Sequence, residues 1–306
     1  NQTAGQLANA VVTYTRDYGM NTPFLKQYAS KKLHIIPPPV ELTETTDEQV
    51  QAFHEQHQLT GRKVIGIAVR LATEKGVEVL LKALPRILEA HPNALVLHAG
   101  QYENVLGEEE YAQRLAPLFE KYKNEYKLLG NLNGAELTAF FRNLDCLVLC
   151  SLNRTESFGL VQIEAMRNGV PCVASNLPGV RQSVQMTGMG EVVPIGDHDA
   201  LAEAVIRVLS DKESYVKDTQ LIADTFDPTH TAEEYHRLFR DLLVNNVDQS
   251  TPEPKAYDQL RAMRDGTYQA PEPEKANSKI SPHKRRRQRE KAPENQEFNT
   301  GVVSDS

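Results

Sequence analysis

The stretch Lys63–Gly100 reads KVIGIAVRLATEKGVEVLLKALPRILEAHPNALVLHAG, and it decides the fold class. Its opening run, Lys63 to Val69, is almost entirely apolar, which is typical of a strand buried on both faces. The segment VEVLLKALPRILEA then places apolar residues at helical spacing, and a second apolar run follows from Ala94 to Gly100. The stretch therefore predicts a strand, a helix and a second strand, the unit from which parallel sheets are built.

The same alternation continues to about residue 245. Further strands are predicted at YKLLG, DCLVLCS, PCVAS and GEVVPI, and helices at EEEYAQRLAPLFEKY, GAELTAFFRNL, GLVQIEAMRNG and DHDALAEAVIRVLSD. This pattern indicates an α/β domain over residues 46–247, a doubly wound parallel sheet of the Rossmann-like kind. In such sheets ligands bind beyond the carboxyl ends of the strands, so the residues just after each strand are the candidates for a site.

The two flanks differ from this domain in composition. Residues 1–45 form a lead-in, and His34 is expected to be a linker residue before Pro37, Pro38 and Pro39. Residues 248–306 are poor in large apolar side chains and rich in Pro, Glu, Lys and Arg, so we expect a disordered tail. The basic run Lys284 to Arg289 is either a solvated part of that tail or a contact with anionic lipid or nucleic acid, and of these two partners lipid is favoured.

Composition limits the class of protein. The net charge of −7 gives no general attraction to nucleic acid, and no nucleic-acid partner is expected. The three cysteines lack paired spacing, which favours a reducing compartment and a cytoplasmic protein, with the cytoplasmic face of a membrane as the variant. Cys146 and Cys150 are expected to be small buried apolar residues, and His98 to pack in the core.

Two cations follow the first strand. Arg70 and Lys75 are five residues apart, Gly76 comes next, and Lys75 is expected near the start of the following helix. Cations at the mouth of a crevice and beside a helix N-terminus suit a diphosphate. Two solvated surface charges are the alternative.

Two glutamates follow the fourth predicted strand, within SLNRTESFGLVQIEAMRNGVPCVAS. Glu156 lies in the loop, and Gly159 lets the backbone approach an anion closely. Leu160 and Glu164 are four residues apart and share one helix face. A carboxylate at Glu164 can accept two hydrogen bonds from a vicinal diol such as ribose. The alternative is an acid at a helix start and an unrelated acid on a helix surface.

The run ESFGLVQIEAM…GVPCVAS, taken with IGIAVRLATEKGVEVLLKALP, resembles the E-x7-E signature and first loop of family 4 retaining glycosyltransferases. This resemblance implies the C-terminal, donor-binding half of a GT-B fold. Residues 1–45 resemble the end of the N-terminal domain and the interdomain linker. Because the chain opens with Asn1 rather than Met, we expect the rest of that domain to be missing from it. One departure is Val69, where the family usually has glycine.

The resemblance implies a role for each matching residue. Arg70 and Lys75 would clamp the diphosphate and stabilise its departure, Glu156 would contact the donor sugar, and Glu164 would bind the ribose. These three catalytic candidates (Glu156, Arg70 and Lys75) belong to a larger donor-binding set: Arg70, Lys75, Asn131, Leu132, Glu156, Ser157, Phe158, Gly159, Leu160 and Glu164. Within it Asn131 and Leu132 would lie near the base, and residues 157–160 would act through backbone groups.

The implied activity is transfer of a hexose, with retention, from a UDP- or GDP-sugar to a glycan or lipid-linked acceptor. No metal and no resident cofactor are expected, because neither a DxD motif at a matching place nor His/Cys metal-ligand spacing is seen. The alternative is a nucleotide-sugar-binding module without activity of its own, or the partner of a separate acceptor-domain subunit. An epimerase of the same architecture is disfavoured by the ESFGL…E run.

Overall fold

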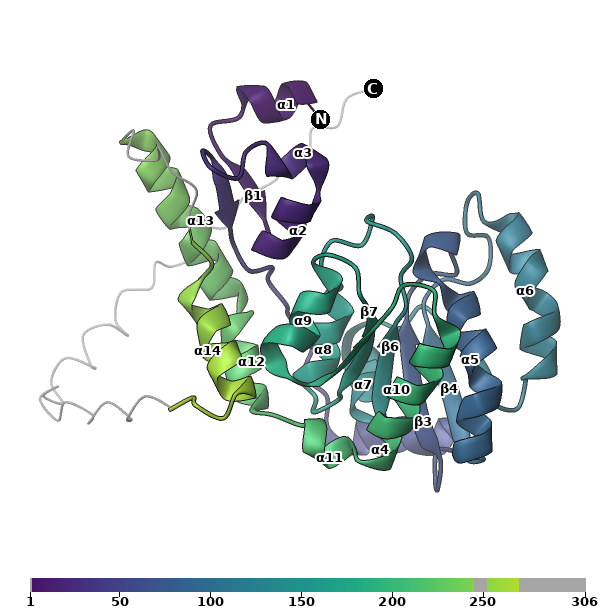
Figure 1. The fold of residues 1–306 in the computed structure, drawn as a ribbon. Coiled ribbons are helices and arrows are strands. Elements are labelled where there is room, and N and C mark those ends of the chain that lie inside the picture. Colours follow the sequence, from purple (N-terminus) through teal and green to yellow (C-terminus); the bar gives the residue numbers. More distant parts are fainter. Residues whose placement is uncertain (1, 245–251, 270–306) are drawn as a thin grey trace, which may run out of the picture. The chain divides into compact units, whose positions relative to one another are not determined.

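The computed structural model of the chain describes residues 2–244 and 252–269. Its centre is a six-stranded sheet in the order β5-β4-β3-β6-β7-β8, with every pair of neighbours parallel (Figure 1). The strands are β3 (Lys63–Ala68), β4 (Ala94–Ala99), β5 (Tyr126–Gly130), β6 (Cys146–Leu149), β7 (Cys172–Ser175) and β8 (Gly190–Val193). The predicted doubly wound parallel sheet is therefore confirmed, with strand bounds that differ by one or two residues.

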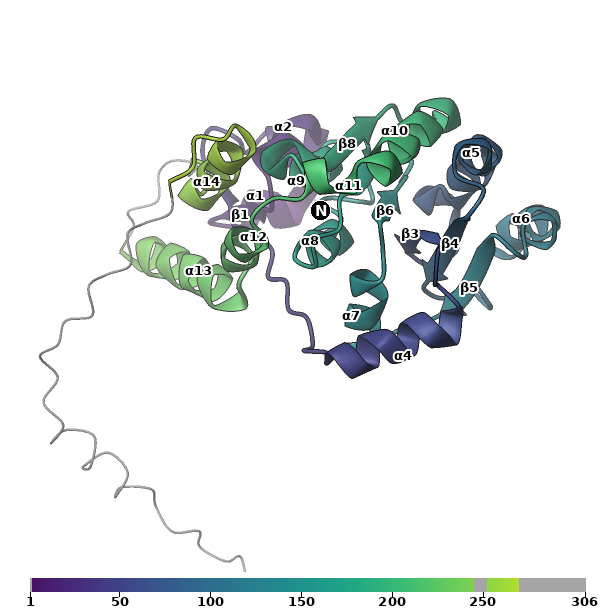
Figure 2. The same cartoon turned by 90° about the horizontal axis from the view of Figure 1, so that it is seen from below.

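Helices cover both faces of this sheet, which explains why its strands are apolar throughout. Every residue of β4, β6 and β7 is buried. Figure 2 shows α5 (Val77–Ala90) and α10 (His198–Ser210) together on one face, with α7 (Gly134–Arg142) on the other. The other helices of the domain are α4 (Asp47–His57), α6 (Glu109–Lys121), α8 (Leu160–Met166), α9 (Val180–Thr187), α11 (Lys212–Tyr215) and α12 (Thr219–Thr225).

The lead-in contains more regular structure than a helix and a linker. Its two strands, β1 (Val11–Thr13) and β2 (Leu33–Ile35), form a parallel pair. The helices beside them are α1 (Gln2–Leu7), α2 (Arg16–Asn21) and α3 (Pro23–Lys26). The linker that follows is anchored to the domain, since the Val40 amide donates to the Phe226 carbonyl at 2.9 Å. That residues 1–45 are the end of a larger N-terminal domain stays a prediction.

One expectation about the flanks is wrong, and a second is wrong for part of its range. His34 lies inside β2 and is 1% exposed, so it is a buried strand residue and not part of the linker. The predicted tail is ordered over its described part, because residues 255–264 form α14 (Lys255–Arg264), which follows α13 (Pro228–Leu243). Tyr257 and Leu260 are fully buried there, and their three-residue spacing gives one helix face. The rest of the tail, including the basic run, lies outside the described residues.

The buried residues singled out in the sequence lie in the core. His98 on β4 donates from Nε2 to the Val69 carbonyl at 2.8 Å, and its Nδ1 accepts from the Tyr126 hydroxyl at 2.9 Å. Cys146, Cys150 and Cys172 are all buried and unpaired. Burial raises the pKa of the Cys150 thiol to about 12, so this thiol stays protonated and behaves as a small apolar group.

Candidate functional site

The predicted site lies where the chain order of the sheet reverses. From β3 the chain runs outward through β4 to β5, and it then crosses to β6 on the other side of β3. The first and fourth strands are neighbours, with Ile65 opposite Cys146 and Gly66 opposite Leu147. The loops that leave β3 and β6 therefore start from neighbouring strands where the strand order reverses, and ligands of doubly wound sheets bind at such a point.

The two loops are joined directly. The β3 loop contains a short 3-10 helix, η1 (Thr73–Lys75), and the Leu152 amide of the β6 loop donates to the Glu74 carbonyl at 2.8 Å. Gly76 ends η1 with a φ of 68°, and a Cβ there would lie 2.2 Å from the Cys150 carbonyl oxygen. Only glycine permits this approach of the backbones, so Gly76 brings Lys75 against the loop that carries Glu156.

Lys75 and Glu156 are 81 residues apart in sequence and form an ion pair, with Nζ donating to Oε2 at 2.7 Å. Their side chains are 21% and 18% exposed, so both are largely withdrawn from solvent but remain reachable. The sequence predicted each residue as catalytic without predicting their contact. A cation and a carboxylate are thus held side by side at the point where the order of the strands in the sheet reverses.

Arg70 is also paired, in this case with Glu74 one turn further along the chain. The Arg70 side chain is 53% exposed and that of Glu74 is 17% exposed. Burial acts to raise the pKa of Glu74, but hydrogen bonds from its own amide and from Arg70 prevail and hold the pKa below its usual value. Glu74 is not among the residues predicted from the sequence, although its four-residue spacing from Arg70 was a signal for the pair.

The turn from the β6 loop into α8 depends on glycine and on one buried amide side chain. Gly159 has a φ of 77°, and a Cβ on it would lie 2.3 Å from Leu149 Cδ2. Gln162 Nε2 donates to the Phe158 carbonyl at 3.1 Å and to the Val180 carbonyl at 2.9 Å. The Phe158 side chain is buried in the core, so its contact with any ligand falls to its backbone.

The remaining predicted residues have different degrees of exposure. Ser157 is half-buried and Leu160 is exposed. Glu164 lies on α8, where burial raises the pKa of its carboxyl and the Arg167 charge offsets part of that rise. Asn131 and Leu132 follow β5, which β4 separates from β3, so they flank the Lys75–Glu156 pair rather than join it.

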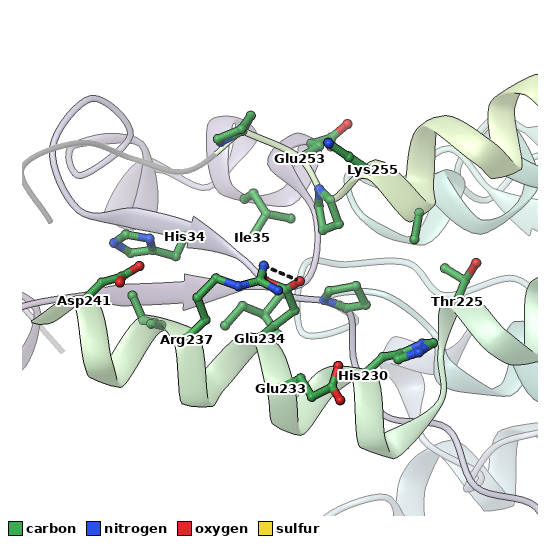
Figure 3. A pocket seen from close by; sticks show the side chains of 16 residues that line it. His34, Ile35, Thr225, His230, Glu233, Glu234, Arg237, Asp241, Glu253 and Lys255 are labelled. Carbon is green, nitrogen blue, oxygen red and sulfur yellow. Dashed lines mark hydrogen bonds and ion pairs between the residues drawn. The ribbon is translucent and has the colours of Figure 1, made fainter. Parts of the chain in front are cut away.

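A separate cavity of about 800 Å³ contains none of the predicted site residues (Figure 3). It is lined by residues of β2 and the segment after it, of α12 and α13, and of the start of α14 with the residues before it. Both ring nitrogens of His34 lack a hydrogen-bond partner there, and burial lowers the pKa of this ring. Its lining includes neither Lys75 nor Glu156, so this cavity is distinct from the predicted site.

Within 2–244 and 252–269, no three His, Cys, Asp or Glu side chains are grouped to hold a metal ion. In the same ranges no helix has the length and apolar character required to cross a membrane.

Curated relatives match more than half of the chain. A phosphatidyl-myo-inositol mannosyltransferase of Mycobacterium leprae is 31% identical over 183 residues, which cover 58% of this chain and 46% of the relative. A D-inositol 3-phosphate glycosyltransferase of Corynebacterium glutamicum is 30% identical, with 62% and 46% covered. The chain thus spans about half the length of these relatives.

Solved structures share the fold at lower identity. The Anabaena protein HepE, crystallised with UDP and glucose, is 20% identical with a TM-score of 0.66, covering 78% of this chain and 64% of that one. A sucrose-phosphate synthase from Thermosynechococcus elongatus is 22% identical with a TM-score of 0.65, covering 78% and 59%. The family described as "Glycosyl transferases group 1" matches residues 49–220, more than half of the chain. With the fold, the strand-end site and this match in agreement, the chain belongs to the group 1 glycosyl transferases.

Proposed function

We propose that this chain carries the donor site of a retaining glycosyltransferase of family 4, which transfers a hexose from a UDP- or GDP-sugar to a glycan or lipid-linked acceptor. The observation that carries the proposal is the ion pair of Lys75 and Glu156, at the point where the order of the strands reverses. The pair joins the first loop to the E-x7-E run, whose resemblance to family 4 suggested these residues. The names of the two curated relatives and the UDP and glucose in the HepE structure support sugar transfer from a nucleotide.

The chemistry requires positive charge beside the leaving group. Cleavage of the anomeric C–O bond leaves positive charge on the sugar and negative charge on the nucleoside diphosphate, so fixed cations lower the barrier. Arg70 and Lys75 would supply those cations. Each is already held by a carboxylate, Glu74 and Glu156 respectively, so it is positioned before the donor arrives.

Donor binding would then redistribute these contacts. The diphosphate oxygens pair with Lys75 in place of Glu156, and Glu156 is then free to accept hydrogen bonds from hydroxyls of the donor sugar. Glu164, one helical turn beyond Leu160, accepts from the ribose hydroxyls. The donor enters as a substrate in this scheme, and no resident cofactor is invoked.

Calorimetry with the 306-residue chain tests the donor site, using UDP, GDP, ADP and their sugars. We expect one nucleoside diphosphate to bind and Lys75→Ala to weaken it about 10- to 100-fold, the usual effect of losing a charge-assisted hydrogen bond. Glu164→Ala should lower the affinity for the same ligand. Lys82→Ala is the matched control, since Lys82 is an exposed lysine that faces Glu78 on α5.

The outcomes separate the proposal from its alternative. Failure of every nucleotide to bind at millimolar concentration contradicts the donor site. If a nucleotide sugar binds, release of the nucleoside diphosphate on addition of a glycan or lipid acceptor supports the transferase. Binding with no release across such acceptors favours the alternative, a nucleotide-sugar-binding module without activity of its own or the partner of a separate acceptor-domain subunit.

A further inference from the structure

Asp17 in the lead-in accepts three hydrogen bonds from Gly179, which ends the β7–α9 connection, and from Arg181 on α9. Its Oδ2 accepts from the Gly179 amide at 2.9 Å and from Arg181 Nε at 2.9 Å, and its Oδ1 accepts from Arg181 Nη2 at 2.6 Å. The Asp17 and Arg181 side chains are 15% and 23% exposed. This is a two-pronged, charge-assisted contact with little solvent around it, the kind that fixes geometry as well as contributing energy.

Gly179 transmits that contact to the loop of Glu156. Its φ is 84°, and a Cβ added to it would lie 2.0 Å from the Ser157 carbonyl oxygen. The backbone of Gly179 is therefore packed directly on the backbone of Ser157, the neighbour of Glu156. Whatever holds Gly179 in place also sets how far the Ser157 carbonyl, and with it Glu156, can move.

Two tyrosines beside Asp17 contact the same loop. The Tyr18 hydroxyl donates to the Arg154 carbonyl at 3.2 Å. The Tyr14 ring meets the Phe158 ring edge-on, with centroids 6.0 Å apart. Glu156 is thus bracketed by contacts at Arg154, Ser157 and Phe158, and each involves the lead-in directly or through Gly179.

We propose that Asp17 is a positioning residue for the donor site: through Gly179 and Ser157 it holds the loop that presents Glu156 to the donor sugar. This inference rests on the proposed function for the role of Glu156. The carboxylate of Asp17 does not touch the donor. It fixes the loop, and Arg181 and the Gly179 amide are the groups through which it acts.

The first test needs no ligand. We compare hydrogen exchange of backbone amides in residues 152–160 between the wild-type chain and Asp17→Asn, which keeps the side-chain size and removes the charge. Exchange should accelerate about 10-fold or more, because charge-assisted hydrogen bonds that restrain the loop are lost. The matched control is Asp47→Asn, since Asp47 also pairs with an arginine on another helix, Arg142, at 2.7 Å. Unchanged exchange in Asp17→Asn overturns the inference.

The second test asks whether Asp17 acts through Glu156. Asp17→Asn should lower the affinity for the nucleotide sugar about five-fold, and it should change the affinity for the nucleoside diphosphate by less than about two-fold. In a Glu156→Gln background Asp17→Asn should then change neither affinity, because the group that it positions is already removed. Additive losses for both ligands would identify Asp17 as a general structural residue and contradict its positioning role.

These outcomes are separable from those of the proposed function. If Glu156→Gln lowers the affinity for the nucleotide sugar and Asp17→Asn does not, the donor site stands and only the role of Asp17 fails. If Glu156→Gln has no effect on the sugar, the role of Glu156 fails first, and the role of Asp17 fails with it. Should Asp17→Asn not fold, Arg181→Gln replaces it in both tests, because it removes the same ion pair and leaves the Gly179 contact.

Discussion

Gly76 and Gly61 have nearly the same left-handed backbone, with φ of 68° and 72°, but very different surroundings. A Cβ at Gly76 would lie 2.2 Å from the Cys150 carbonyl oxygen, whereas a Cβ at Gly61 would meet nothing within 4 Å. The strain of a left-handed alanine is common to both positions. The difference between them isolates the close approach of the β3 and β6 loops.

We therefore expect Gly61→Ala to lower the free energy of unfolding by about 1–2 kcal/mol, the usual cost of that backbone conformation. Gly76→Ala should lower the free energy of unfolding by more than this. It should also lower the affinity for the nucleoside diphosphate, because the η1 turn must move and Lys75 moves with it. Urea denaturation and calorimetry measure the two effects. Equal stability losses with unchanged affinity would show that the contact of the loops does not position Lys75.

At this scale the sequence predicted which residues lie together better than how they interact. Lys75 and Glu156 could be found because each follows an apolar strand. Their ion pair depends on the approach at Gly76, which no local pattern encodes. The pair of Asp17 and Arg181 joins residues 164 apart in sequence, so it could not be predicted without the fold.

Among the elements, strands were the easiest to predict and polar helices the hardest. The strands of the sheet are short, apolar and bounded by turns, so their pattern is unambiguous. The helix α4 was missed because it buries only Phe53. Its start was nonetheless encoded, since Thr46 and Gln49 form a reciprocal capping box. The helix α14 was missed because its two buried residues, Tyr257 and Leu260, lie in a segment of otherwise tail-like composition.

The buried histidine His98 makes the stability of the fold depend on pH. Burial lowers the pKa of His98 on β4 to about 4, more than the hydrogen bond to the Val69 carbonyl raises it. Its ordinary value is 6.5, so below pH 6.5 the unfolded chain binds a proton that the folded chain does not. The stabilisation is fully present above pH 6.5, and roughly 3 kcal/mol is lost as the pH falls to 4.

Replacement by glutamine separates this effect from packing. His98→Gln should lower stability at pH 7, where the bonds to Val69 and Tyr126 are perturbed, but should flatten the decline between pH 6.5 and 4. His198→Gln, at an exposed position, is the control and should keep the wild-type slope. Urea denaturation at several pH values measures both. A His98→Gln curve parallel to wild type would mean that this ring does not govern the acid sensitivity.

In the molecule as a whole, four aromatic rings from four separate segments of the chain pack in series. Phe158 of the β6 loop meets Tyr14 of the lead-in and, at 5.7 Å between centroids, Phe226 at the end of α12. Phe226 in turn meets Tyr257 of α14 at 6.0 Å. The Tyr257 hydroxyl donates to the Tyr14 carbonyl at 2.9 Å, which returns the series to its start.

This arrangement predicts a large effect for a residue in a region that composition marks as tail. Tyr257→Ala should lower the free energy of unfolding by about 3–5 kcal/mol, because a fully buried ring is replaced by a cavity. Tyr257→Phe should cost only about 1 kcal/mol, the hydrogen bond to Tyr14. Gln259→Ala, at an exposed position of the same helix, is the control. A loss below about 1 kcal/mol in Tyr257→Ala would show that α14 packs loosely on the domain.

The bond between Tyr257 and Tyr14 spans 243 residues, and it has a consequence for synthesis on the ribosome. Translation delivers Tyr14 and Phe158 long before α14, so the sheet and the loop of Glu156 can assemble while one side of the ring series is still open. Phe226 lacks its Tyr257 neighbour until α14 has emerged. A chain released before Lys255 would thus contain every strand of the sheet but lack the ring that packs on Phe226.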